Sequence, residues 1–192
     1  MKIEMNEILQ TILSRRSVRA YQPRQIDEKD LQEILLAGQY APSAMGDQPW
    51  HFTVVQNTVL IENLQILCKA SFQNSDNATL RELSSREDVH VFYHAPSLVI
   101  VSGDSKAVAP LWDCVLAMEN MLLAASSLGI SSCWVHSPMM VYGTPEGPAS
   151  LSSIGLNFPE NHVPYAAAVF GYSALPLPEA APRKPDTVTF LK

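Results

Sequence analysis

The hydrophobic and polar positions near the start of the chain follow helical spacing. The first apolar face is made of Met5, Ile8, Leu9, Ile12 and Leu13. A second helix is predicted to begin at Asp27, whose carboxylate can cap the free N–H groups of the first turn. Ile26 and Leu31 are spaced for a hydrophobic staple, and Pro42 stops this helix. Two amphipathic helices therefore open the chain.

Two further helices are predicted in the middle of the chain. One covers residues 60–68, and the other covers residues 111–128 and closes at Gly129, a residue suited to a left-handed cap. The second is apolar nearly all round, so it belongs in the middle of the molecule. The polar stretch over residues 73–89 is interpreted as a mobile surface excursion.

Strand patterns alternate with these helices. Residues 50–55 are rich in β-formers, and residues 97–101 form a continuous apolar run, typical of a strand covered on both faces. Residues 133–135 and 165–170 supply further strands. The prediction is an α+β fold, with a central mixed or antiparallel β-sheet wrapped by helices.

The end of the chain has a different character. From Ser173 onward it is rich in proline, and it finishes in the β-prone residues 187–191. Such a segment can form neither a helix nor a central strand. We therefore divide the chain into a domain over residues 1–172 and an extended C-terminal arm over residues 173–192.

Composition narrows the class of protein. With 192 residues, 47% of them apolar, the chain suits one packed domain, and a net charge of −6 argues against nucleic acid as a partner. The longest apolar helical stretch, residues 116–128, is too short and too polar to span a membrane, and residues 1–7 lack a signal-peptide core. Three cysteines without a CxxC pair indicate reduced thiols. The expected location is the cytoplasm.

Several well-known sites are missing from the sequence. Its eight glycines never form GxG, and neither GxSxG nor HExxH occurs. His90 and His94 have metal-ligand spacing, but no third ligand is evident, so we interpret them as two partly exposed histidines and expect no metal site. His51 is interpreted as a packed core histidine. We also expect no side-chain nucleophile or other catalytic side chain.

Two segments carry more specific chemistry. Arg15, Arg16 and Arg19, with Arg24 nearby, concentrate four of the thirteen cations of an acidic chain. Such a cluster is either a solvent-exposed turn or a binding site for a small anion. The second segment runs over residues 41–52, with the sequence APSAMGDQPWHF. Taken alone, this segment is typical of a turn followed by a strand.

Together and in this order, the two segments resemble the nitroreductase family. Members of this family have a helix ending in R-[RH]-S-x-[RK]-x-[YF], followed by [AS]-P-S-x-x-N-x-Q-P-W-x-[FI]. The similarity continues through residues 94–101, 113–125 and 128–134 to Gly171-Tyr172 and the arm. It covers nearly the whole chain. The resemblance implies an FMN-dependent enzyme that uses NADH or NADPH to reduce nitroaromatics, quinones or similar electron-poor acceptors by a ping-pong mechanism.

The resemblance also implies the cofactor-binding residues. Arg15 and Arg183, with Lys184 as a weaker candidate, would hold the FMN phosphate, because arginine binds phosphate in a bidentate way. Ser17 would bond ribityl or phosphate oxygens, and Arg16 the ribityl chain. Arg19 would stabilise negative charge on the pyrimidine side of the reduced flavin.

The remaining implied contacts come from two turns. The turn Pro42-Ser43-Ala44 would approach the flavin from a partner subunit, and a backbone N–H near His136-Ser137 would face flavin N5. Gly46 stands where the family pattern has Asn, and His136-Ser137 replaces a Gly-Gly or Glu-Gly pair. His136 is either a substrate-pocket residue or a spectator.

The resemblance further implies a homodimer in which the C-terminal arms are exchanged. Two alternative functions stay open. One is a specialised flavin enzyme of the same superfamily, such as a dehalogenase or a flavin-fragmenting enzyme, with a substrate lid at residues 73–89 or 139–153. The other is a flavin-binding module without catalytic turnover. The sequence identifies neither the acceptor nor the preferred nicotinamide nucleotide.

Overall fold

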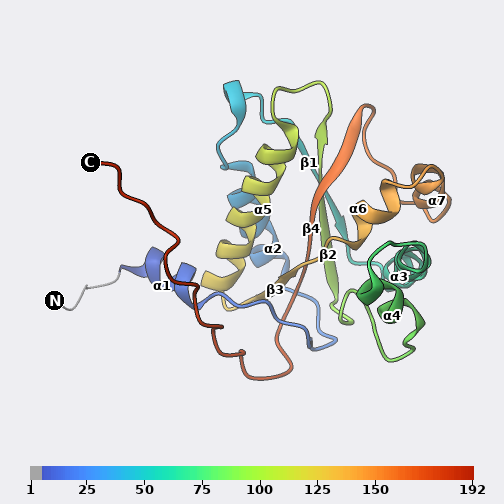
Figure 1. The fold of residues 1–192 in the computed structure, drawn as a ribbon, viewed down its shortest axis with the longest axis horizontal. Coiled ribbons are helices and arrows are strands. Elements are labelled where there is room, and N and C mark those ends of the chain that lie inside the picture. The colour runs from blue at the N-terminus through green and yellow to red at the C-terminus, as the bar shows by residue number, and fades with distance from the viewer. Residues whose placement is uncertain (1–5) are drawn as a thin grey trace.

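A four-stranded antiparallel sheet forms the centre of the molecule (Figure 1). The computed structural model describes residues 6–192. The strands, in the order β1-β2-β4-β3, are β1 (Trp50–Val55), β2 (Ser97–Asp104), β4 (His162–Gly171) and β3 (Ser131–Trp134). Every pair of neighbouring strands is antiparallel. Between the two arrangements left open by the sequence, the structure thus selects the antiparallel one.

Helices cover both faces of this sheet, as the continuous apolar run predicted. Leu98 and Ile100 of β2 point into a core shared with α3 (Thr58–Gln73), α6 (Ser137–Tyr142) and α7 (Gly147–Ser153). Val99 and Val101 point into the opposite core, which is shared with α2 (Glu28–Gln39) and α5 (Pro110–Ser127). Successive side chains of a strand alternate between faces, so β2 contributes to both layers.

The long helix α5 ends as predicted, but it is less enclosed than expected. Gly129 adopts φ +73°, the left-handed conformation that glycine tolerates at a helix end. Met118 and Met121 are fully buried, whereas Trp112 is 67% and Leu116 is 45% exposed. One side of this apolar helix is therefore uncovered within a single chain.

The first helix, α1 (Glu7–Ser14), also leaves its apolar face uncovered. Asn6 caps it, because its side-chain oxygen accepts a hydrogen bond from the N–H of Leu9 at 2.9 Å. None of its residues is buried, and Ile8 is 70% exposed. Met5, the first residue of the predicted apolar face, lies outside the described residues.

Two local expectations need correction. The polar stretch 73–89 contains a helix, α4 (Ala78–Ser85), because Asn77 accepts a hydrogen bond from the N–H of Thr79 at 2.9 Å and so caps its start. Asp27 is the N-cap of α2, but its carboxylate binds the Arg24 guanidinium at 3.0 Å instead of the first-turn N–H groups. The arginine offers a charge-assisted bond, so it outcompetes the cap.

The C-terminal arm leaves the body of its own chain. It is fixed at its base, where the N–H of Ala174 donates to the carbonyl of Ala20 at 3.0 Å. Residues 174–192 are all exposed, and residues 187–191 form no strand. Figure 1 shows the arm in red, running past α1 and away from the sheet. Among the described residues, no helix has the length and apolar character needed to cross a membrane.

Candidate functional site

The arginine segment that follows α1 lies against the edge strand β3. Ser17 forms a parallel bridge with Ser132, and the N–H of Val18 donates to the carbonyl of Ser132 at 3.0 Å. Arg15 is the C-cap residue of α1, so the chain changes there from helix to extended backbone. This change presents the following side chains along β3.

Three of the predicted residues surround one buried side chain of β3, that of Cys133. Burial raises the pKa of the Cys133 thiol, while the positive charges of Arg19 and Arg15 and a hydrogen bond with Ser17 oppose this increase. The structure therefore brings Arg15, Ser17 and Arg19 together at one edge of the sheet.

Arg19 has a partner that the sequence analysis missed. Its Nε donates to the hydroxyl of Tyr93 at 3.3 Å, and its guanidinium carbon lies 5.8 Å from the centre of the Tyr93 ring. This hydrogen bond raises the pKa of Arg19 above its usual value, although an arginine is charged with or without it. The two residues are far apart in sequence, and no local pattern could have linked them.

Arg16 is bound to backbone oxygens. Its Nη1 donates to the carbonyls of Leu13 at 2.7 Å and Arg15 at 2.8 Å, and its Nε donates to the carbonyl of Pro178 at 3.2 Å. It thereby joins the end of α1 to the base of the C-terminal arm. The ribityl contact implied for this residue stays a prediction.

The charge of this edge is not balanced by acidic side chains. In residues 6–192, the cations that form ion pairs are Arg24, Lys29 and Arg86, together with His90 if it is protonated. Arg15, Arg16 and Arg19 are not among them. Arg15 and Arg16 are half-buried, and Arg19 is exposed. A cluster of cations without carboxylate partners suits a bound anion such as a phosphate.

The segment His136-Ser137 lies just beyond the end of β3. His136 is exposed, whereas Ser137 is 5% exposed and is the first residue of α6. The first N–H groups of a helix have no partner within the helix, so the N–H of Ser137 is free of intrahelical bonding. The Ser137 side chain is hydrogen bonded to Cys68, whose pKa is raised by burial to about 12.

The second motif forms a tight turn at the end of α2. Within it, the N–H of Ala44 donates to Oδ1 of Asp113 at 3.0 Å, and the hydroxyl of Ser43 accepts from the N–H of Gln48 at 3.0 Å. Pro42 precedes this turn and is exposed. Gly46 has φ +73°, a left-handed conformation that glycine and asparagine both tolerate. The replacement of the usual Asn by Gly46 therefore fits the backbone.

The two motifs lie at opposite ends of α5 (Figure 1). The 42–46 turn is bonded to Asp113 in the first turn of this helix, whereas Arg15 and Arg16 line a pocket that includes Ser126 in its last turn. A helix rises about 1.5 Å per residue, so these two points are about 20 Å apart. Within one chain, the two groups of predicted contacts do not meet.

Arg183 and Lys184 lie in the exposed arm. In residues 6–192, no hydrogen bond or shared pocket joins either residue to Arg15 or to the 42–46 turn. Their implied phosphate contacts stay predictions, as do the other implied contacts with FMN.

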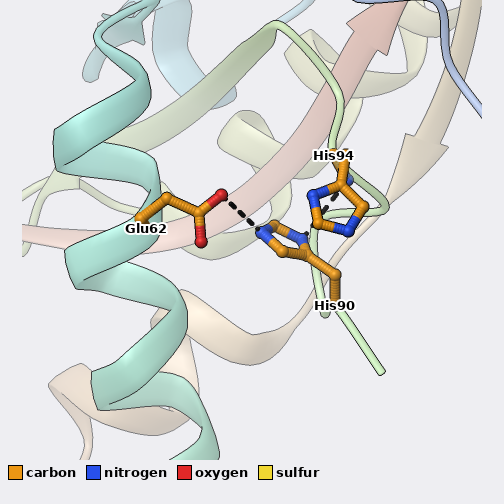
Figure 2. Close-up of side chains that lie close together, drawn as sticks. All are labelled: Glu62, His90 and His94. Atoms are coloured by element: carbon orange, nitrogen blue, oxygen red, sulfur yellow. Dashed lines mark hydrogen bonds and ion pairs between the residues drawn. The ribbon is translucent and has the colours of Figure 1, made fainter. Parts of the chain in front are cut away.

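The structure corrects the interpretation of three histidines. His90 is largely buried, and its Nε2 lies 3.1 Å from Oε1 of Glu62 on α3, while the exposed His94 stacks against it with ring centres 4.0 Å apart (Figure 2). The third group therefore comes from a distant helix. His51 is exposed, because it lies on the edge strand β1 rather than in the core.

Comparisons with known proteins agree with this architecture. The model of the Nitroreductase family matches residues 12–172. A solved nitroreductase with bound FMN from Bacteroides fragilis is 46% identical, with a TM-score of 0.87 over 98% of this chain and 100% of that chain. A second solved nitroreductase with bound FMN, from Desulfitobacterium hafniense, is 27% identical, with a TM-score of 0.86 over 98% of this chain and 100% of that chain. An Archaeoglobus fulgidus protein named "Putative NADH dehydrogenase/NAD(P)H nitroreductase" is 35% identical over 88% of this chain and 86% of its own length.

Proposed function

The chain belongs to the nitroreductase family, and from this premise we propose that it is an FMN-dependent oxidoreductase. It takes electrons from NADH or NADPH and passes them to nitroaromatics, quinones or similar electron-poor acceptors in a ping-pong reaction. The observation that carries the proposal is the cluster of Arg15, Ser17 and Arg19 beside β3, whose cations have no acidic partner among residues 6–192.

This cluster suits the two charged parts of FMN. Arg15 is placed to bind the phosphate, with the hydroxyl of Ser17 as a second donor. Arg19 is always charged, and its bond to Tyr93 helps to hold the guanidinium in place, so it can stabilise the negative charge of a reduced flavin. The bound FMN supplies the hydride chemistry, and the side chains position it and exclude competing reactions.

The positions of the two motifs support a site shared between two chains. The 42–46 turn is bonded to the first turn of α5, whereas Arg15 and Arg16 line a pocket with Ser126 in its last turn, about 20 Å further along the helix. We infer that one chain does not place both motifs against one flavin. In a homodimer, the Pro42-Ser43-Ala44 turn of the second chain completes the site. The exposed arm, residues 173–192, carries Arg183 and Lys184 towards the phosphate bound by the second chain.

The proposal also assigns the FMN-binding domain, the contact with flavin N5 and the cellular environment. Residues 1–172 form the FMN-binding domain, and the N–H of Ser137 is the donor proposed to face flavin N5, with His136 at the rim of the substrate pocket. The three cysteines are buried and unpaired, in keeping with the reducing environment of a cytoplasm. No observation favours a dehalogenase, a flavin-fragmenting enzyme or a non-catalytic module over this assignment.

An anaerobic titration tests the proposal. The purified protein, reconstituted with FMN, is expected to hold about one flavin per chain, to lose its yellow colour with NADH or NADPH, and to regain it with a nitroaromatic or quinone. Free FMN with the same reagents is the control. A protein that binds FMN without being bleached by either nucleotide would be a binding module, and one that does not bind FMN would refute the proposal entirely.

A further inference from the structure

The turn over residues 90–94 is held in an unusual conformation. Tyr93 and His94 have φ values of 56° and 53°, so two consecutive residues that are not glycine lie in the left-handed region. Such a conformation is strained for residues other than glycine and persists only where the surroundings fix it. Something in the structure must therefore hold this turn.

Part of the restraint comes from the backbone and from α3: the N–H groups of Tyr93 and Ala95 donate to carbonyls within the turn at 3.0 Å, and the N–H of Val91 donates to Oε1 of Gln65 at 2.8 Å. The imidazole of His90 supplies two further bonds. Its Nδ1 accepts hydrogen bonds from the backbone N–H groups of Phe92 at 3.1 Å and His94 at 3.3 Å. The proton of the neutral ring must then be on Nε2, which faces Oε1 of Glu62 at 3.1 Å (Figure 2). One ring thus bonds two N–H groups of the turn and connects it to α3.

This tautomer decides between two interpretations of the cluster. Glu62, His90 and His94 each offer one ligand atom, all within 4.8 Å of one another, which is the grouping that a metal ion needs. A histidine that binds a metal through Nε2 carries its proton on Nδ1 and donates it. Here Nδ1 faces two N–H donors, so a proton at that atom would break both bonds. The arrangement suits a neutral histidine and disfavours a metal ligand.

The turn also carries the residue that contacts the arginine cluster. Tyr93 lies between the two N–H groups that His90 binds, and its hydroxyl accepts the hydrogen bond from Nε of Arg19. We propose that neutral His90 is a proton-sensitive clamp, which closes the 90–94 turn and thereby positions Tyr93 against Arg19. The effect on the flavin rests on the proposed function, whereas the clamp itself does not.

The direction of the pH dependence follows from the groups that face His90. Burial lowers the pKa of His90 most, the positive charges of His94 and Lys69 lower it further, and the carboxylate of Glu62 partly opposes them. A lowered pKa in the folded state means that the unfolded chain binds the proton more readily. The stabilisation is therefore complete above about pH 6.5, the usual value, and is lost as the pH falls from there through the lowered pKa.

Two substitutions at the same position separate the clamp from simple packing. In His90→Asn, the side-chain oxygen can still accept from the N–H two residues onward, but nothing titrates there. In His90→Leu, both N–H groups lose their acceptor while the residue stays large and apolar. His51→Asn, on the exposed edge strand, is the control for removal of a histidine.

The first measurement is amide hydrogen exchange of Phe92 and His94 between pH 5 and pH 8, corrected for intrinsic rates. We expect wild type and His51→Asn to lose protection as the pH falls below about 6.5. His90→Asn should keep the protection of Phe92 throughout, and His90→Leu should have lost it, by about fivefold or more, at every pH. Unchanged protection in His90→Leu, or parallel pH profiles for wild type and His90→Asn, would overturn the clamp.

Two further measurements complete the test. In the first, Zn²⁺ is added and amide exchange in the turn is measured again. If Zn²⁺ slows exchange in the wild-type protein but not in variants that lack His90 or Glu62, the cluster is a metal site and the clamp is wrong. With FMN bound, the flavin midpoint potential should become more negative in His90→Leu and stay near the wild-type value in His90→Asn. A wild-type protein that binds no FMN would refute the proposed function, while the exchange data would still decide on the clamp.

Discussion

At the residue scale, the arginines beside β3 differ from Arg24 and Arg86, the two arginines that form ion pairs in residues 6–192. Arg24 and Arg86 are exposed and paired with aspartates, whereas Arg15 and Arg19 are not part of any ion pair in residues 6–192. The sequence alone could predict this cluster, because its members are close in the chain. It could not predict Tyr93 or Glu62, whose contacts with Arg19 and His90 depend on how distant segments fold together.

The first prediction concerns the phosphate. Arg15→Ala should weaken FMN binding by about 1.5–3 kcal/mol, the range of a hydrogen bond to a charged group. Fluorescence titration of the apoprotein measures this change. Lys29→Ala is the matched control, because Lys29 is a highly exposed cation on α2, away from the site. If Arg15→Ala and Lys29→Ala bind FMN equally well, the phosphate assignment is wrong.

The second prediction concerns His136, which is exposed next to the buried Ser137. His136→Ala should change the ranking of acceptors, measured as kcat/KM for several nitroaromatics and quinones. It should leave the rate of flavin reduction by NADH or NADPH nearly unchanged, because that step depends on placement rather than on this side chain. A variant that retains FMN and its fold but is no longer reduced would place His136 in the chemistry itself.

At the scale of elements, the apolar pattern predicted the four strands and the helices α1, α2, α3 and α5, but it predicted neither α6 nor α7, nor what covers each element. The strands β1 to β4 and the cap at Gly129 agree with it. The helix α4 was also missed, since its apolar face consists of only Leu80 and Leu83 and its start depends on the cap at Asn77. The exposed sides of α1 and α5 could not be foreseen, because amphipathicity does not identify the chain that covers a face.

The third prediction concerns the connection between α5 and the 42–46 turn. Asp113 is 3% exposed, and its Oδ1 accepts the N–H of Ala44. Asp113→Ala leaves that donor without a partner, so we expect a loss of about 1–3 kcal/mol in the free energy of unfolding and weaker FMN binding. Urea denaturation and FMN titration measure the two effects.

Asp113→Asn is the control for this prediction. The amide oxygen of asparagine can still accept the hydrogen bond from the N–H of Ala44. The substitution removes the negative charge, and Oδ2 of Asp113 has no hydrogen-bond partner among residues 6–192. We expect it to keep both stability and FMN affinity close to wild type. Equal losses in both variants would show that the charge of Asp113, not its bond to the turn, is what matters.

At the scale of the whole molecule, the uncovered apolar surfaces point to association. Ile8 on α1 is 70% exposed, Trp112 on α5 is 67% exposed, and Phe190 in the arm is 80% exposed. Together with the contacts of the two motifs near opposite ends of α5, these surfaces support the proposed dimer with two shared sites. The arm could be recognised in the sequence, because its prolines exclude regular structure, but its direction away from the sheet required the fold.

The fourth prediction concerns the C-terminal arm. Deletion of residues 174–192 keeps the bridge between Tyr21 and Ser173 but removes the exposed Val188, Phe190 and Leu191. Without these side chains the proposed dimer would lose apolar contact area, and without Arg183 it would lose a proposed phosphate ligand. We therefore expect aggregated or monomeric protein with little FMN, as measured by light scattering and by the flavin content per chain.

The full-length variant Arg183→Ala separates the two roles of the arm. It retains the apolar end of the arm, so it should remain dimeric while its FMN affinity falls by about 1.5–3 kcal/mol, as for Arg15→Ala. The deletion should lose both properties, because a flavin shared between chains needs the interface as well as the cation. If the truncated protein stays dimeric and fully loaded with FMN, the arm neither locks the dimer nor binds the phosphate, and both assignments must be abandoned.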